Sequence, residues 1–178
     1  MTIRFLVLSA SLRPQSLSRV LAEHAYSCLR ESGVEVEWMD LRDWDLPSCD
    51  ASDCYSHPKV VEIKERLISV DGYLVASPIY NYDVSSAFKN VVELTGKDVW
   101  SDKVVGFLAA AGGQGSYMSL CGITNSLMLD FRTLVLPRFV FANNADFDDW
   151  AISNPEIQTR LEELSTELVR VTSALRPR

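Results

Sequence analysis

Residues 3–18 read IRFLVLSASLRPQSLS, and this stretch decides the architecture of the chain. Residues 3–9 form a nearly continuous apolar run, which is expected of a strand buried on both faces of a parallel sheet. The polar loop of residues 10–16 follows. From Leu17 onward apolar residues recur at helical spacing until Gly33, a residue type that commonly ends helices. Strand, loop and amphipathic helix together predict the first part of a βαβ unit.

The same alternation of apolar runs and helical patterns continues to the end of the chain. Four further strands are predicted at residues 34–39, 71–77, 103–111 and 133–142. Helices are predicted to begin near Pro58, Ser85 or Ser86, after the glycine-rich residues 112–116, and at Asn154 and Pro155. Pro137 interrupts the fifth strand, and proline is tolerated more easily at a sheet edge than in its centre.

Five consecutive βα units place helices on both faces of one parallel sheet. Crossovers should be right-handed, and the fifth strand is expected at an edge. The expected fold is therefore an α/β, flavodoxin-like three-layer sandwich whose five-stranded parallel sheet has the order 2-1-3-4-5. No repeat, linker or low-complexity segment is visible, so residues 1–178 are expected to form a single domain.

Composition narrows the classes of partner. The chain has 178 residues, of which 47% are hydrophobic and 23% charged, and its formal net charge is −7. This charge argues against a nucleic-acid partner, because phosphate neutralisation needs clustered lysine and arginine. We expect neither a membrane span nor a secretion signal, since the apolar runs are too short for either. The four cysteines match no zinc-binding spacing, which predicts no metal site and a reducing, cytoplasmic environment.

In open α/β sheets, ligands bind beyond the carboxyl ends of the strands, at the switch between the first and third strands. The loop of residues 10–16 is predicted there and opens a helix, whose exposed N–H groups attract an anion. Arg13 adds a planar cationic fork suited to phosphate. The candidate phosphate-binding residues are Ser9, Ser11, Arg13, Ser16, Leu17 and Ser18. The alternative is a serine-rich helix cap beside a solvated arginine, and the loop matches neither a dinucleotide fingerprint nor a Walker loop.

Two more loops are predicted at the same edge. Residues 78–84 supply a proline and two tyrosines that can form a wall beside a flat ring, while backbone amides meet its polar rim. Glycines in residues 111–116 let the backbone approach a ligand closely. The alternatives are a turn whose aromatics cover the core and an ordinary tight turn. The candidate ring-binding residues are Pro78, Ile79, Tyr80, Asn81, Ala111, Gly112, Gly113 and Gln114.

Together the three loops resemble the NADPH-dependent FMN reductase family of the flavodoxin-like superfamily, along the full length of the chain. Residues 10–18 (ASLRPQSLS) match the family's phosphate loop G-S-x-R-x-x-S-x-N, with alanine and serine replacing the glycine and asparagine. The family's P-x-Y-N and K-N motifs and its glycine-rich third loop are matched by Pro78, Tyr80, Asn81, Lys89, Asn90, Gly112 and Gly113. Ile79 stands where glutamate is frequent, and Ser85 and Ser86 replace a common Pro-Gly segment.

The resemblance implies FMN at these loops, NADPH or NADH as hydride donor, and a small-molecule acceptor such as a quinone, flavin, azo dye or chromate. It also implies a homodimer or homotetramer with the flavin near the interface. Because the flavin carries the chemistry, we assign no catalytic side chain, and we interpret His57 as a helix cap and His24 as a surface or packed residue. The alternatives are a flavodoxin-type electron carrier that docks on redox proteins, and a module that has lost its cofactor.

Overall fold

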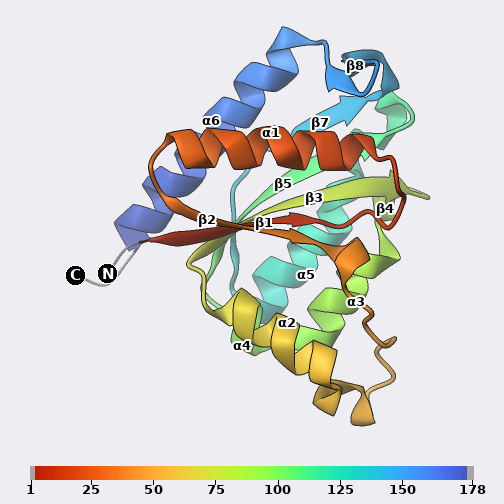
Figure 1. Cartoon of the computed structure of the whole chain (residues 1–178), viewed down its shortest axis with the longest axis vertical. Coiled ribbons are helices and arrows are strands. Elements are labelled where there is room, and N and C mark those ends of the chain that lie inside the picture. The colour runs from red at the N-terminus through yellow and green to blue at the C-terminus, as the bar shows by residue number, and fades with distance from the viewer. Residues whose placement is uncertain (1–2, 176–178) are drawn as a thin grey trace.

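The computed structural model describes residues 3–175 and has three layers, with a sheet between two layers of helices (Figure 1). The sheet has the order β2-β1-β3-β5-β6, and these neighbours pair in parallel. The bounds of its strands are β1 Arg4–Ser9, β2 Glu35–Asp40, β3 Gly72–Tyr80, β5 Val104–Ala111 and β6 Leu134–Val135. The predicted flavodoxin-like order 2-1-3-4-5 is confirmed, with β5 and β6 as the fourth and fifth strands. Two short strands extend the sheet: β4 (Asp83–Val84) pairs antiparallel with β3, and β7 (Val140–Asn143) pairs parallel with β5.

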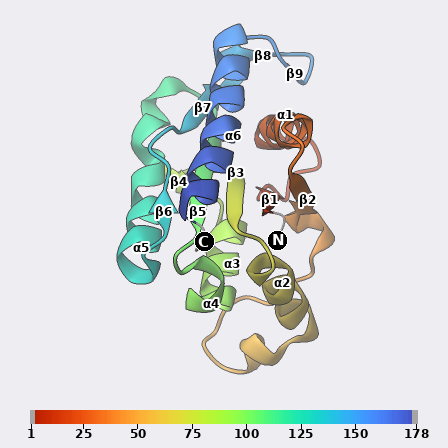
Figure 2. The same ribbon diagram turned by 90° about the vertical axis from the view of Figure 1, so that its left-hand side faces the viewer.

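The helices divide between the two faces of the sheet (Figures 1 and 2). One face is covered by α1 (Leu17–Glu31) and α6 (Pro155–Leu175). The other is covered by α2 (Pro58–Ile68), α3 (Ser86–Thr95), α4 (Lys97–Trp100) and α5 (Cys121–Phe131). The smaller elements are η1 (Leu41–Asp43), η2 (Asp53–Ser56), η3 (Gln114–Leu120), η4 (Asn144–Asp146), β8 (Phe147–Asp148) and β9 (Ala151–Ile152).

Burial on both faces explains the apolar run that opens the chain. In β1, Phe5 and Val7 belong to the core beneath α1 and α6, whereas Leu6 and Leu8 belong to the core beneath the other helices. All four side chains are completely buried. Neither face of β1 reaches water, so the strand shows no alternation of apolar and polar residues.

The predicted starts of the helices near Pro58 and Ser85 are confirmed by the local hydrogen bonds. Ser85 caps α3, and its hydroxyl accepts from the backbone N–H of Phe88. His57 caps α2 through its Nδ1, which accepts from the backbone N–H of Lys59, and Pro58 occupies the first turn.

Three predicted boundaries are wrong. Residues 133–142 do not form one strand, because the chain pairs with β5 as two pieces, β6 and β7, on either side of Pro137. Residues 78–84 are not a loop: β3 continues to Tyr80, and β4 pairs back on it. Pro78 is tolerated there because β1 pairs with β3 only as far as Ala76 and no longer flanks it. In the third loop, η3 already begins at Gln114, so that only Gly112 and Gly113 separate it from β5.

The short helix α4 and the β8–β9 hairpin are not predicted from the sequence. Their lengths, four residues for α4 and two for each strand, are below what a periodic apolar pattern can identify.

Close packing of α6 on the sheet depends on Gly106 in the middle of β5. A Cβ atom at this position would lie 2.7 Å from Leu74 Cδ2 and 3.0 Å from Leu164 Cδ1. Both leucines are completely buried, so neither side chain has free space to move into.

We therefore expect Gly106→Ala to lower the free energy of unfolding by about 1–3 kcal/mol, the usual cost of overpacking a core. Gly115→Ala is the matched control, because a Cβ atom at Gly115 meets nothing within 4 Å. Urea unfolding followed by circular dichroism measures both variants. Equal midpoints for the two variants would contradict the packing argument.

Candidate functional site

The loop between β1 and α1 lies at the carboxyl edge of the sheet and is tied to its neighbours. The backbone N–H of Ala10 donates to the carbonyl of Ala76 at 2.9 Å. The hydroxyl of Ser85, at the start of α3, donates to the carbonyl of Ala10 at 2.8 Å. Thus β1, β3 and α3 meet where the loop begins. The loop therefore lies at the topological switch point, where the chain connections from neighbouring strands run in opposite directions.

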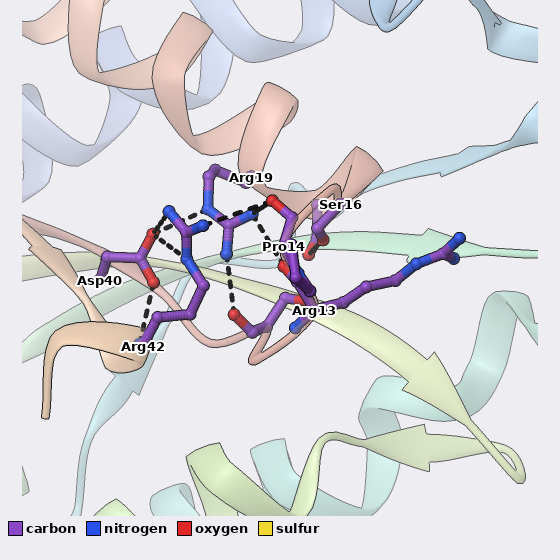
Figure 3. Close-up of polar contacts among 8 residues, drawn as sticks. Arg13, Pro14, Ser16, Arg19, Asp40 and Arg42 are labelled. Atoms are coloured by element: carbon purple, nitrogen blue, oxygen red, sulfur yellow. Dashed lines mark hydrogen bonds and ion pairs between the residues drawn. The ribbon is translucent and has the colours of Figure 1, made fainter. Parts of the chain in front are cut away.

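Arg19, a buried residue of α1, holds the shape of this loop (Figure 3). Its Nη1 donates to the carbonyls of Arg13 and Pro14, both at 3.0 Å, and its Nη2 donates to the carbonyl of Ser11 at 2.9 Å. The C=O and N–H groups of a trans peptide point in opposite directions. With the carbonyls of Ser11 and Pro14 turned toward Arg19, the N–H groups of Leu12 and Gln15 face the other way.

Asp40, the last residue of β2, compensates the buried charge of Arg19. Its Oδ2 accepts from Nε of Arg19 at 2.7 Å and from Nη2 of Arg42 at 2.8 Å, while its Oδ1 accepts from the backbone N–H of Arg42 (Figure 3). Burial alone would raise the pKa of Asp40, but the hydrogen bonds from Arg42 and Arg19 outweigh it and hold the pKa below its usual value. The carboxylate therefore stays charged and fixes the guanidinium that shapes the loop.

At the N-terminus of α1, backbone N–H groups lack an acceptor in the described part of the chain. Ser16 is the N-cap, but its side chain makes no capping hydrogen bond, because its hydroxyl pairs with that of Ser18 at 2.9 Å. Within residues 3–175, the backbone N–H groups of Leu17 and Ser18 have no acceptor. The hydroxyl of Ser9 is also buried without a partner in this part of the chain. Orphaned donors at a helix N-terminus are what an anion requires.

Arg13 is exposed at the tip of the same loop. Figure 3 shows its side chain extending away from the cluster of Arg19, Asp40 and Arg42. Its backbone N–H donates to the hydroxyl of Ser11, but its guanidinium pairs with no acidic group among the described residues. This cation is therefore available to a ligand.

The second predicted segment, residues 78–81, lies on the end of β3 and the turn that follows. Ile79 is buried and packs in the core on the α3 side, so it can offer only its backbone to a ligand. Side chains alternate along a strand, so Tyr80 lies on the α1 side of the sheet, where it is exposed. The turn residues Asn81 and Tyr82 both have positive φ.

The third segment, residues 111–114, follows the adjacent strand β5, and Ala110 pairs directly with Pro78 of β3. Cβ atoms at Gly112 and Gly113 would meet nothing within 4 Å, so the backbone there is open to close approach. Beyond it, η3 carries the exposed side chains of Tyr117 and Met118. The second and third segments therefore lie side by side.

Two cavities flank the three segments. One, of about 470 Å³, reaches from Leu12 to Trp44 and α3. Asn90 of α3 forms its wall by accepting from the backbone N–H of Cys49 at 2.8 Å and donating to the carbonyl of Pro47 at 2.9 Å. The other, of about 280 Å³, begins at Gln114 and ends at Arg160 of α6.

These features fit FMN. The unsatisfied donors around Ser9, Leu17 and Ser18 and the unpaired Arg13 match a phosphate. The bare backbone at Gly112 and Gly113 matches a flat polar ring. The predicted site residues lie in these three segments, except for Ser9, at the end of β1, and Leu17 and Ser18, at the start of α1. Sequence reasoning missed Arg19 and Asp40, for which the one local signal was an acidic residue directly after a predicted strand.

The structure gives no cluster of histidine, cysteine, aspartate and glutamate side chains suited to a metal ion within residues 3–175. No helix in that range is long and apolar enough to cross a bilayer. His24 is half-buried within α1.

Comparisons with known proteins identify the family of this chain. The sequence pattern of the family described as NADPH-dependent FMN reductase matches residues 3–148. An NADPH:quinone oxidoreductase of Arabidopsis thaliana is 31% identical over 143 residues, which covers 77% of this chain and 73% of the relative. An NAD(P)H-dependent FAD/FMN reductase of Geobacillus thermodenitrificans is 27% identical over 145 residues, covering 80% and 78%. The structure of FerB, a flavoenzyme NAD(P)H:(acceptor) oxidoreductase from Paracoccus denitrificans, shares the fold, with a TM-score of 0.77, 19% identity and coverage of 97% and 98%.

The contribution of the ion pair between Arg19 and Asp40 to stability can be tested by removing the charge of Asp40. Asp40→Asn leaves a buried guanidinium without its countercharge, so we expect a loss of about 3 kcal/mol in the free energy of unfolding at pH 7. Asp43→Asn, a change at an exposed neighbouring residue, should have little effect.

The pH dependence has a definite sign. The folded-state pKa of Asp40 lies below its unfolded value, so its contribution is complete above about pH 4 and disappears as the pH falls through the lowered pKa. The stability difference between the wild type and Asp40→Asn should therefore narrow below about pH 4. Urea unfolding at several pH values measures this difference in the free energy of unfolding. A difference that stays constant with pH would show that the charge of the carboxylate does not contribute to stability.

Proposed function

Because the chain belongs to the NADPH-dependent FMN reductase family, we propose that the three segments at the carboxyl edge of its sheet bind FMN and present it to NADPH or NADH and to a quinone-like acceptor. The protein is a flavin-dependent NAD(P)H oxidoreductase. The observation that carries the site assignment is the loop of residues 10–16, whose carbonyls are held by Arg19. The backbone N–H groups of Leu17 and Ser18, which follow this loop, have no acceptor within residues 3–175.

In this proposal the phosphate lies at the N-terminus of α1. The backbone N–H groups of Leu17 and Ser18 donate to it, together with hydroxyls of the serine-rich loop. Arg13 adds charge-assisted hydrogen bonds from the tip of the loop. Arg19 does not contact the ligand; it is a positioning residue that keeps the loop carbonyls away from the anion.

In this proposal the backbone at the ends of β3 and β5 would hold the flavin ring. When bound, FMN would supply the redox chemistry, which is hydride transfer from NAD(P)H and reduction of the acceptor. The chain's contribution is to hold the ring through the backbone of residues 78–81 and 112–113 and to leave its surroundings open to both substrates. In this proposal no side chain is assigned as an acid or base.

Self-association and location extend the proposal. Leu129 of α5 is 84% exposed, and Tyr117 and Met118 are exposed beside the site, so a second copy of the chain is a suitable cover for these apolar groups. The four cysteines are free, which suits a reducing, cytoplasmic environment.

Arg13 provides the sharpest test of the phosphate site. A hydrogen bond to a charged group is strong, so Arg13→Ala should weaken FMN binding by roughly ten- to a hundredfold. Arg13→Lys should recover only part of the loss, because an ammonium group lacks the planar fork. Fluorescence titration of the apo-protein measures these affinities.

Two controls separate a phosphate contact from general damage. Riboflavin has no phosphate and should bind wild type and Arg13→Ala equally well. Arg170→Ala, at an exposed position on α6 far along the chain, should leave FMN affinity unchanged. If Arg13→Ala bound FMN as tightly as wild type does, the phosphate would have to lie elsewhere.

Turnover distinguishes a reductase from an electron carrier. We expect the FMN-loaded protein to consume NADPH or NADH continuously when a quinone is present, with a kcat on the order of 1–1000 s⁻¹. Absorbance at the nicotinamide band follows the reaction. Consumption that stops after one equivalent per flavin, and resumes only with a redox partner protein, would favour the carrier.

A further inference from the structure

An aromatic residue occupies a strained position in the β3–β4 hairpin. The strands are joined by two residues, Asn81 and Tyr82, between the paired residues Tyr80 and Asp83. Their φ values are +50° and +67°, and a two-residue hairpin with positive φ at both positions is a type I′ turn. Asparagine tolerates this conformation, but a bulky residue at the second position is disfavoured relative to glycine. Tyr82 therefore stands where local energetics favour a residue without a side chain.

The hairpin places this residue next to the proposed flavin site. It extends beyond the end of β1 at the carboxyl edge of the sheet (Figure 1). Tyr80 and Tyr82 are 54% and 53% exposed, although large aromatic side chains normally bury most of their surface. The same hairpin includes the backbone of residues 78–81, assigned above to the flavin ring. On its other side β4 contacts η3, which exposes Tyr117.

We propose that Tyr82 is a specificity-determining residue that, with Tyr80, forms a stacking surface for a planar aromatic acceptor of the quinone class. This proposal rests on the function proposed above. The face of a tyrosine ring attracts another flat π-system, and such stacking does not depend on which substituents the acceptor carries. An acceptor without a flat ring gains nothing from it.

The chain contains a matched control for the strain. The β8–β9 hairpin is joined by Asp149 and Trp150, whose φ values are +42° and +62°, so that an aromatic residue again occupies the second position. Trp150 is 45% exposed. This hairpin follows β7 and η4, outside the three segments assigned to the flavin. Strain and exposure are thus shared by the two hairpins, whereas only the hairpin of Tyr82 contains one of the three segments assigned to the flavin.

The test compares Tyr82→Gly, Tyr82→Phe and Trp150→Gly in the FMN-loaded protein, with a naphthoquinone and with ferricyanide as acceptors. We expect Tyr82→Gly to raise KM for the quinone about tenfold, which corresponds to about 1.4 kcal/mol. Its KM for ferricyanide, its FMN affinity and its rate of flavin reduction by NADPH in stopped flow should stay at the wild-type values. Tyr82→Phe keeps the ring and should keep the quinone KM, and Trp150→Gly should match wild type with both acceptors.

Each remaining outcome counts against the proposal. An unchanged quinone KM in Tyr82→Gly would remove the role of Tyr82, and an equal rise for ferricyanide would indicate general damage rather than stacking. A rise in Tyr82→Phe would assign the effect to the hydroxyl. A change in oligomeric state of Tyr82→Gly, measured by sedimentation, would show that the ring packs against a second copy. Failure of the wild type to turn over the quinone at all, with FMN bound, would instead contradict the proposed function.

Discussion

The buried ion pair between Arg19 and Asp40 is the interaction on which the loop between β1 and α1, at the carboxyl edge of the sheet, depends for its shape. A guanidinium at this depth is stable only with a countercharge, and Asp40 supplies it from the end of β2. The remaining donors of Arg19 are then free to bind three loop carbonyls. The order of the sheet matters for this reason: β2 must lie beside β1 for Asp40 to reach Arg19 in α1. The carboxylate of Asp40 thus makes the shape of the loop depend on the order of the strands.

The parts of the fold that sequence could predict are those that follow from burial. The sheet order follows from five apolar runs, an edge proline and right-handed crossovers, and the complete burial of Phe5 to Leu8 shows why the first run lacks alternation. The predictions that were wrong are strand and loop boundaries that depend on pairing between segments distant in the sequence. Nothing local indicates that Pro78 will pair with Ala110, and the end of β1 at Ser9 is what makes a proline acceptable there. Tertiary pairing overrides local preference in such positions.

The candidate site shows the same division. The serine-rich loop and Arg13 could be found because loop composition and position after a strand carry the signal. Arg19 was missed because a helical pattern assigns arginine to the solvent face, and only the structure shows the carbonyls that it satisfies. The type I′ turn at Asn81 and Tyr82 was missed because its sequence signature requires glycine, which this hairpin lacks. Residues that are held by partners far along the chain, or held against their own preference, leave little trace in a local pattern.

The contacts of Arg19 also affect the free energy of binding a ligand at this loop. A loop that takes its shape from a ligand must be ordered anew at every binding event, and the entropy of ordering is subtracted from the affinity. Here the carbonyls of Ser11, Arg13 and Pro14 are held by the protein's own side chain. The cradle is therefore preorganised, and its form does not require an occupant. In the FMN site proposed above, the phosphate would therefore bind and leave without a folding step in this loop.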